Sequence, residues 1–152
     1  MTKKRVYLVL FCLILCFIWG NSLLSKEMSG AISHFIADIL GGEQGATDEG
    51  HHLLRKAAHF CEFASLGAVF FLWLREKLGN SSTSLTMLTS CALVGVSVPL
   101  IDETIQIFSQ RGPALADVWI DISGYAVGTL ICLIILRIIA RAVRKKTTVE
   151  RS

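Results

Sequence analysis

The chain has 152 residues, of which 53% are hydrophobic and only two are proline. Fifteen basic and twelve acidic residues leave a net charge of +3, which does not indicate a nucleic-acid-binding protein. The length fits one domain, residues 1–152, and the composition excludes an ordinary soluble enzyme. A transmembrane helix needs about 20 mostly apolar residues, and four stretches of this chain meet that requirement.

The first stretch, residues 6–24, contains no charged residue. Basic residues at positions 3–5 before it are also typical of a signal peptide. No small-residue cleavage pattern follows, because the chain continues Trp-Gly-Asn-Ser at positions 19–22. We therefore expect an uncleaved signal anchor that forms the first span.

The segment between the first two spans carries a short amphipathic pattern within residues 32–40. Its apolar residues recur at the spacing of one helix face: Ile32, Phe35, Ile36, Ile39 and Leu40. This pattern is too short to span a bilayer. It predicts a short amphipathic helix on the outer surface, which either covers the bundle or only packs on the helix ends.

The second span, residues 57–75, places ionisable groups on one face at its beginning. Arg55, His59 and Glu62 stand at i, i+4 and i+7. Glu62 should lie about 10 Å deeper than Arg55, at a rise of about 1.5 Å per residue. Arg55 and Lys56 can extend to the interface, whereas Glu62 needs a partner, a proton or water.

The third span, residues 85–108, carries its polar groups near its end. Asp102 and Gln106 are four residues apart and share a face. Glu103 points about 100° away from Asp102, so only one of the two carboxylates is expected to face inward. Arg111 follows in the turn to the next span.

The fourth span, residues 117–138, begins with a stripe of acidic residues and then glycines. Asp117, Asp121, Gly124 and Gly128 stand at i, i+4, i+7 and i+11. The Gly-x-x-x-Gly pair lets a neighbouring helix approach closely. The two carboxylates should therefore lie at the end of a tight helix contact.

Basic residues outside the spans set the expected orientation. Eleven of the fifteen fall before the first span, between the second and third, or from position 137 onward. Short basic segments stay in the cytoplasm, so both termini of a multi-pass cell-membrane protein are predicted there. The basic tail, residues 139–152, suits an anionic lipid surface. All the intramembrane charges then gather at the extracytoplasmic end.

Three interpretations of this polar cluster remain open. The first is a charge network that holds the helices together, with Arg55 and Arg111 paired to aspartates. The second is a pocket for a lipid or glycolipid head group, with or without acid–base chemistry. The third is a metal site based on His59 and Glu62, which stand at i and i+3. Only one histidine falls inside a span, so no metal or cofactor is predicted.

The order and spacing of these blocks resemble the VanZ-like family of small bacterial membrane proteins. The resemblance covers about residues 50–136 and rests on Arg55-Lys56-x-x-His59-Phe60-x-Glu62-Phe63, Asp102-Glu103-x-x-Gln106, Arg111 and Asp117-x-x-x-Asp121-x-x-Gly124-x-x-x-Gly128. Many members carry asparagine where this chain has Asp121. The resemblance implies a cell-envelope protein, since founding members lower susceptibility to teicoplanin, a lipid-tailed glycopeptide antibiotic.

We therefore expect an all-α membrane protein, a four-helix transmembrane bundle with a short amphipathic outer-surface helix between the first and second spans. Its expected partners are membrane lipids, a glycolipid head group or an amphiphilic glycopeptide antibiotic, and not nucleic acid. The alternatives are a scaffold for envelope machinery and a metal-assisted membrane enzyme; the sequence assigns no reaction. The candidate catalytic residues are Glu62, His59, Asp102 and Glu103, and the candidate ligand-binding residues are Arg55, Lys56, Gln106, Arg111, Asp117 and Asp121.

Overall fold

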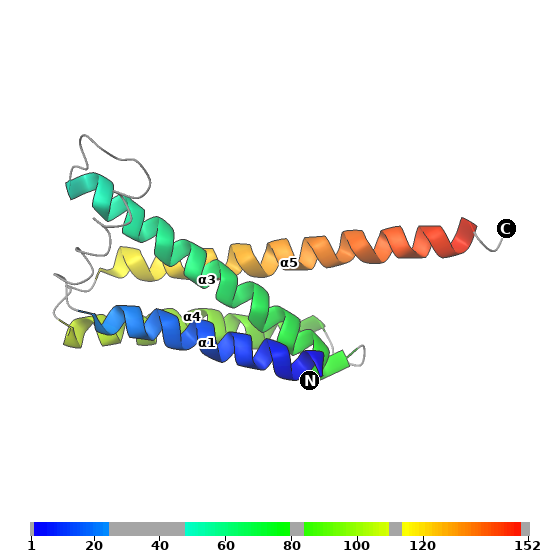
Figure 1. Ribbon diagram of the computed structural model, residues 1–152, viewed down its shortest axis with the longest axis horizontal. Helices are drawn as coiled ribbons and strands as arrows, with labels where there is room; N and C mark the ends of the chain where they lie inside the picture. Colours follow the sequence, from blue (N-terminus) through cyan, green and yellow to red (C-terminus); the bar gives the residue numbers. More distant parts are fainter. Residues whose placement is uncertain (1, 25–47, 80–83, 110–113, 150–152) are drawn as a thin grey trace.

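A computed structural model describes residues 2–24, 48–79, 84–109 and 114–149, and four helices make up nearly all of this part of the chain (Figure 1). Each of the four is long and apolar enough to cross a membrane. The predicted all-α fold with four spans is confirmed. The helices are α1 (Lys3–Leu23), α3 (Asp48–Leu78), α4 (Ser84–Phe108) and α5 (Leu115–Val149).

Two helices continue well past the apolar stretches that define their spans. Helix α3 begins at Asp48 rather than at residue 57, and α5 reaches Val149 rather than residue 138. A helix needs only its backbone hydrogen bonds to continue into water, and neither extension contains proline. The predicted amphipathic helix at residues 32–40 lies outside the described residues.

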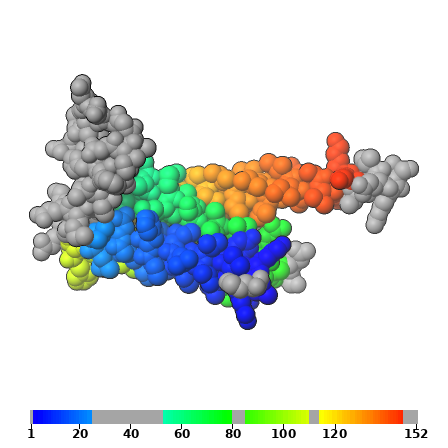
Figure 2. Space-filling model, in the orientation of Figure 1, coloured from blue at the N-terminus to red at the C-terminus, as the bar shows by residue number. Residues whose placement is uncertain are grey.

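Successive helices run in opposite directions along the bundle (Figure 1). The ends of α1 and α4 and the beginnings of α3 and α5 therefore meet at one end, which we call the polar end. Helix α1 lies beside α4, α3 crosses the bundle, and α5 extends beyond the other helices (Figures 1 and 2). This arrangement brings together the ionisable residues that the sequence scatters over three spans.

Backbone contact between α3 and α5 fixes the middle of the bundle. A Cβ atom added to Gly124 would lie 2.5 Å from the Phe60 carbonyl oxygen, and one added to Gly128 would collide with the carbonyl oxygen of Ala64. A Cβ on Gly67 of α3 would in turn collide with the carbonyl oxygen of Tyr125. The close approach predicted from the glycine stripe is confirmed.

An apolar core fills the space below the polar end. Buried side chains from all four helices contribute to it: Ile18, Phe63, Leu66, Phe70, Leu74, Val98 and Tyr125. Large apolar side chains also cover the outside of the bundle; Phe17, Leu93 and Trp119 are each more than 60% exposed. An apolar core inside an apolar exterior is the pattern expected of helices surrounded by lipid.

Candidate functional site

Every polar or charged side chain that is buried in the described residues belongs to the polar end. The set comprises Ser22, His59, Asp102, Glu103, Gln106 and Asp121. They come from all four helices, and they leave the rest of the interior apolar. Buried polar groups in a membrane bundle are costly, so their concentration at one end marks a candidate functional site.

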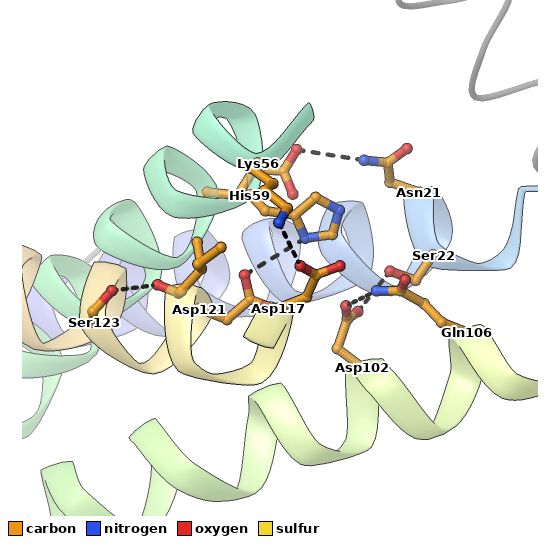
Figure 3. A network of polar contacts seen from close by, with 11 residues as sticks. Asn21, Ser22, Lys56, His59, Asp102, Gln106, Asp117, Asp121 and Ser123 are labelled. Carbon is orange, nitrogen blue, oxygen red and sulfur yellow. Dashed lines mark hydrogen bonds and ion pairs between the residues drawn. The ribbon is translucent and has the colours of Figure 1, made fainter. Parts of the chain in front are cut away.

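Asp102 occupies the centre of this site and is fully buried. Its Oδ1 atom accepts a hydrogen bond from the Ser22 hydroxyl at 2.7 Å, and its Oδ2 atom accepts one from the Gln106 amide at 2.9 Å (Figure 3). The Ser22 bond joins α1 to α4, whereas Gln106 lies one turn further along α4. Asp102 is therefore held in a fixed orientation.

His59 and Asp121 face each other across the α3–α5 contact (Figure 3). The His59 Nδ1 and Asp121 Oδ1 atoms lie 3.7 Å apart, within ion-pair range if the imidazole is protonated but too far for a hydrogen bond. Both Asp121 oxygens are buried and lack a hydrogen-bond donor among the described residues. Their placement follows from the glycine contact, since Asp121 lies one turn before Gly124 on α5.

A narrow cleft leads from this buried group towards the surface. It contains about 270 Å³ of space between atoms, including the part open to solvent, and has room for about one water-sized occupant. The Lys56 Nζ and Asp117 Oδ1 atoms lie 3.5 Å apart at its half-buried edge. The cleft is lined by Arg55, Lys56, His59, Gln106, Asp117, Ile120 and Asp121.

Two of the predicted catalytic carboxylates make contacts away from this cleft. Glu62 accepts a long hydrogen bond of 3.5 Å from the Asn21 amide of α1. Glu103 accepts a hydrogen bond of 2.5 Å from the backbone N–H of Ala114, just before α5 begins. A carboxylate at this position complements the positive end of the helix dipole. Glu103 thus supports the start of α5.

The expectation that only one of Asp102 and Glu103 faces inward is wrong. Both are buried, with 0% and 8% of their surface exposed. The reason is that Asp102 faces Ser22 of α1 while Glu103 contacts the start of α5, so two adjacent faces of α4 are covered. Lys56, rather than Arg55, pairs with Asp117. Arg111 lies outside the described residues.

Sequence signals for the contribution of α1 to the site were weak. Asn21 and Ser22 lie at the end of the first span with Ser25, which is outside the described residues, and serine in membrane helices usually bonds its own preceding turn. The structure instead directs the Ser22 hydroxyl to Asp102 and lets Ser109 donate to the Ser22 carbonyl oxygen at 2.9 Å. The clue in the sequence was a polar pair at the end of an otherwise apolar span.

The helices and the site define a class: an integral membrane protein of four helices with a buried polar cluster at one end of its bundle. Within that class the sequence is specific enough to assign a family. The model of the VanZ/LLP1 family matches residues 6–137, and the chain belongs to that family. No curated protein and no solved structure matches the chain. The resemblance drawn from the charged blocks is thereby confirmed, and the match includes the first span.

Proposed function

We propose that the polar cluster binds the head group of a cell-envelope lipid or glycolipid, or an amphiphilic antibiotic, at the extracytoplasmic face. The main support for this proposal is the cleft that runs from the surface, past Arg55 and Lys56, to the buried carboxylates. The orientation rests on the eleven basic residues that the sequence places before the first span, between the second and third, and from position 137 onward. Membership of the VanZ/LLP1 family supports a link to teicoplanin susceptibility.

The size of the cleft limits what part of a ligand it can take. Pockets that enclose whole small molecules usually measure about 300–1,000 Å³, and this cleft is smaller and partly open. A sugar or peptide head group would therefore remain at the opening. One anionic group, a phosphate or a carboxylate, would contact Arg55 and Lys56.

An apolar groove between α4 and α5 supports a lipid-like ligand. It contains about 970 Å³ of space, including the part open to solvent, and on α5 its lining starts at Ile122, the residue after Asp121. Tyr125 and Gly95 face each other within it, since a Cβ on Gly95 would lie 2.6 Å from the tyrosine ring. Such a groove offers an acyl chain a place beside α5, the helix that also contributes Asp117 and Asp121 to the cleft.

Retention of lipid by the purified protein tests head-group binding. Arg55→Gln removes a cation from the cleft, and Arg75→Gln removes an exposed cation from the other end of the same helix. We expect native mass spectrometry in detergent to find a defined anionic lipid on the unaltered protein and on Arg75→Gln, but at least about tenfold less on Arg55→Gln. Equal retention in both variants would contradict a head-group site.

Antibiotic susceptibility tests the cellular consequence. In a sensitive Gram-positive host, the protein should protect against teicoplanin more than against vancomycin. Arg55→Gln, which alters the cleft, should remove most of this protection, whereas Arg75→Gln, at an exposed position of α3, should retain it. Protection that is unchanged in an equally expressed Arg55→Gln protein would show that the cleft does not cause the antibiotic effect.

A scaffold function is the second candidate, and the contacts between helix ends favour it. Ser22 with Asp102 and Glu103 with Ala114 join α1, α4 and the start of α5. If the cluster is only architectural, Glu62→Gln should lower thermal stability in detergent and reduce activity in the same proportion. A stable but inactive Glu62→Gln protein would exclude a purely architectural role.

A further inference from the structure

Three buried side chains of the polar end form a geometry suited to a metal ion. His59 of α3, Asp102 of α4 and Asp121 of α5 each offer one ligand atom, and these atoms all lie within 4.8 Å of one another. Their exposed fractions are 9%, 0% and 1%. Within the described part of the chain, this is the group of histidine, cysteine and acidic residues that comes close enough together to share an ion.

The carboxylate of Asp121 is an independent sign of a missing partner. It is 1% exposed, and neither oxygen has a hydrogen-bond donor among the described residues. Burial, and then the nearby carboxylates of Asp102, Asp117, Glu103 and Glu62, disfavour a negative charge on Asp121. A buried carboxylate is stable only with hydrogen bonds, a proton or a cation. A bound cation would provide Asp121 with a partner and reduce the repulsion from all four acidic neighbours.

The distance between His59 and Asp121 agrees with shared coordination, and a ligand atom of Asp102 lies within 4.8 Å of both. Two ligands of one tetrahedral zinc, with bonds of about 2.1 Å, lie about 3.4 Å apart. His59 Nδ1 and Asp121 Oδ1 are 3.7 Å apart, so a shift of a few tenths of an ångström brings them to that separation. Asp102 is already oriented by Ser22 and Gln106, in the way that outer hydrogen bonds orient metal ligands.

We propose that His59, Asp102 and Asp121 bind one divalent transition-metal cation. One imidazole with two carboxylates suits Zn²⁺ or Mn²⁺ better than Mg²⁺ or Ca²⁺, which favour all-oxygen sites. The ligand set differs from the His59–Glu62 pair considered from the sequence, because Glu62 bonds to Asn21 of α1. Three protein ligands leave a coordination position for water or an anionic oxygen. The inference goes beyond the proposed function, since the cation site requires no lipid.

Metal content of the full chain in detergent tests the site directly. All samples, including the parent protein, carry His51→Ala and His52→Ala, so that these two histidines outside the site cannot bind metal. After incubation with Zn²⁺ or Mn²⁺ and desalting, elemental analysis should find about one ion per chain. Asp121→Asn, which preserves the shape of the side chain, should bind at least about tenfold more weakly, whereas Glu76→Gln should bind like the parent protein. Equal metal content in Asp121→Asn and Glu76→Gln would overturn the site.

A second measurement needs no variant of the ligands, so it remains informative if Asp121→Asn does not fold. Zn²⁺ or Mn²⁺ should raise the Tm of the parent protein, and Mg²⁺ at the same concentration should raise it less. A parent protein that binds no metal and shows no such shift would also overturn the site. Lipid retention in the same samples distinguishes the cation site from head-group binding. Metal that binds without retained lipid would support the cation site and contradict head-group binding.

Discussion

The polar end and the apolar middle of the bundle are built in opposite ways. In the middle, α3 and α5 touch through backbone atoms at Gly67, Gly124 and Gly128, and apolar side chains fill the remaining space. At the polar end, contacts are made by side chains that carry charges or hydrogen-bonding groups. These contacts differ in length: the Ser22–Asp102 hydrogen bond is 2.7 Å long, whereas the His59 and Asp121 atoms are 3.7 Å apart.

This difference indicates how stability and function are divided. Close packing without polar groups is sufficient to associate membrane helices, and the apolar middle supplies it. We therefore expect that the buried charges of the polar end are not required to hold α3 against α5. They occupy the place where we propose that a ligand binds, since intramembrane charges in other proteins often mark binding or transport sites.

The strongest test of this division is Gly128→Ala. The added methyl group collides with the Ala64 carbonyl oxygen, which is backbone and cannot move aside. We expect a loss of about 3 kcal/mol in the free energy of unfolding, seen as a lower Tm in detergent. Gly20→Ala is the matched control because nothing lies within 4 Å of its added Cβ, and it should change stability by less than about 0.5 kcal/mol. Similar Tm values for the two variants would show that the glycine contact does not determine stability.

A smaller effect is expected from Ser22→Ala. It removes the 2.7 Å hydrogen bond to the buried Asp102 carboxylate. Hydrogen bonds inside membrane proteins contribute about 0.6 kcal/mol on average and at most about 1.7, so we expect a loss of about 1 kcal/mol. Ser123→Ala is the control, since that exposed hydroxyl bonds only the Ile120 carbonyl oxygen of its own helix. If Ser22→Ala lowers the free energy of unfolding as much as Gly128→Ala does, the polar end contributes as much to the stability of the bundle as the glycine contact.

The smallest change in stability is expected from Lys56→Ala. Its pair with Asp117 is 3.5 Å long and about a quarter exposed on each side, so it should contribute less than about 1 kcal/mol. Lipid retention should nevertheless fall, because Lys56 lines the cleft. Lys145→Ala, at the far end of α5, should change neither Tm nor lipid retention. A large drop in Tm for Lys56→Ala with unchanged lipid retention would show that Lys56 stabilises the bundle and does not bind lipid.

Much of the fold could be predicted because each span is a local pattern of the sequence. The four apolar stretches, the shared face of His59 and Arg55, and the Gly124–Gly128 contact depend only on helix geometry. Gathering the charges at one end requires only that successive spans alternate in direction. These inferences need no knowledge of how the helices rotate against one another.

The pairing of residues between helices could not be predicted, because it depends on those rotations. Periodicity places Asp102 and Gln106 on one face, but it does not say that Ser22 of α1 meets Asp102. Nor does it direct Glu103 to the start of α5 or bring Asp121 opposite His59. A rotation of one helix by a single residue, about 100°, would exchange these partners.

The length of α5 gives the polar end a mechanical connection to the opposite side of the membrane. A single helix carries Asp121 near its beginning and Lys146 in its last turns, with no proline between them. About 27 Å separate Gly128 from Lys146 at a rise of about 1.5 Å per residue. A tilt of about 5° around the contact with Ala64 then moves Lys146 by about 2 Å. One continuous helix thus joins the two ends of the bundle, so under the proposed function a ligand that shifts Asp121 would also displace the basic residues near the end of α5.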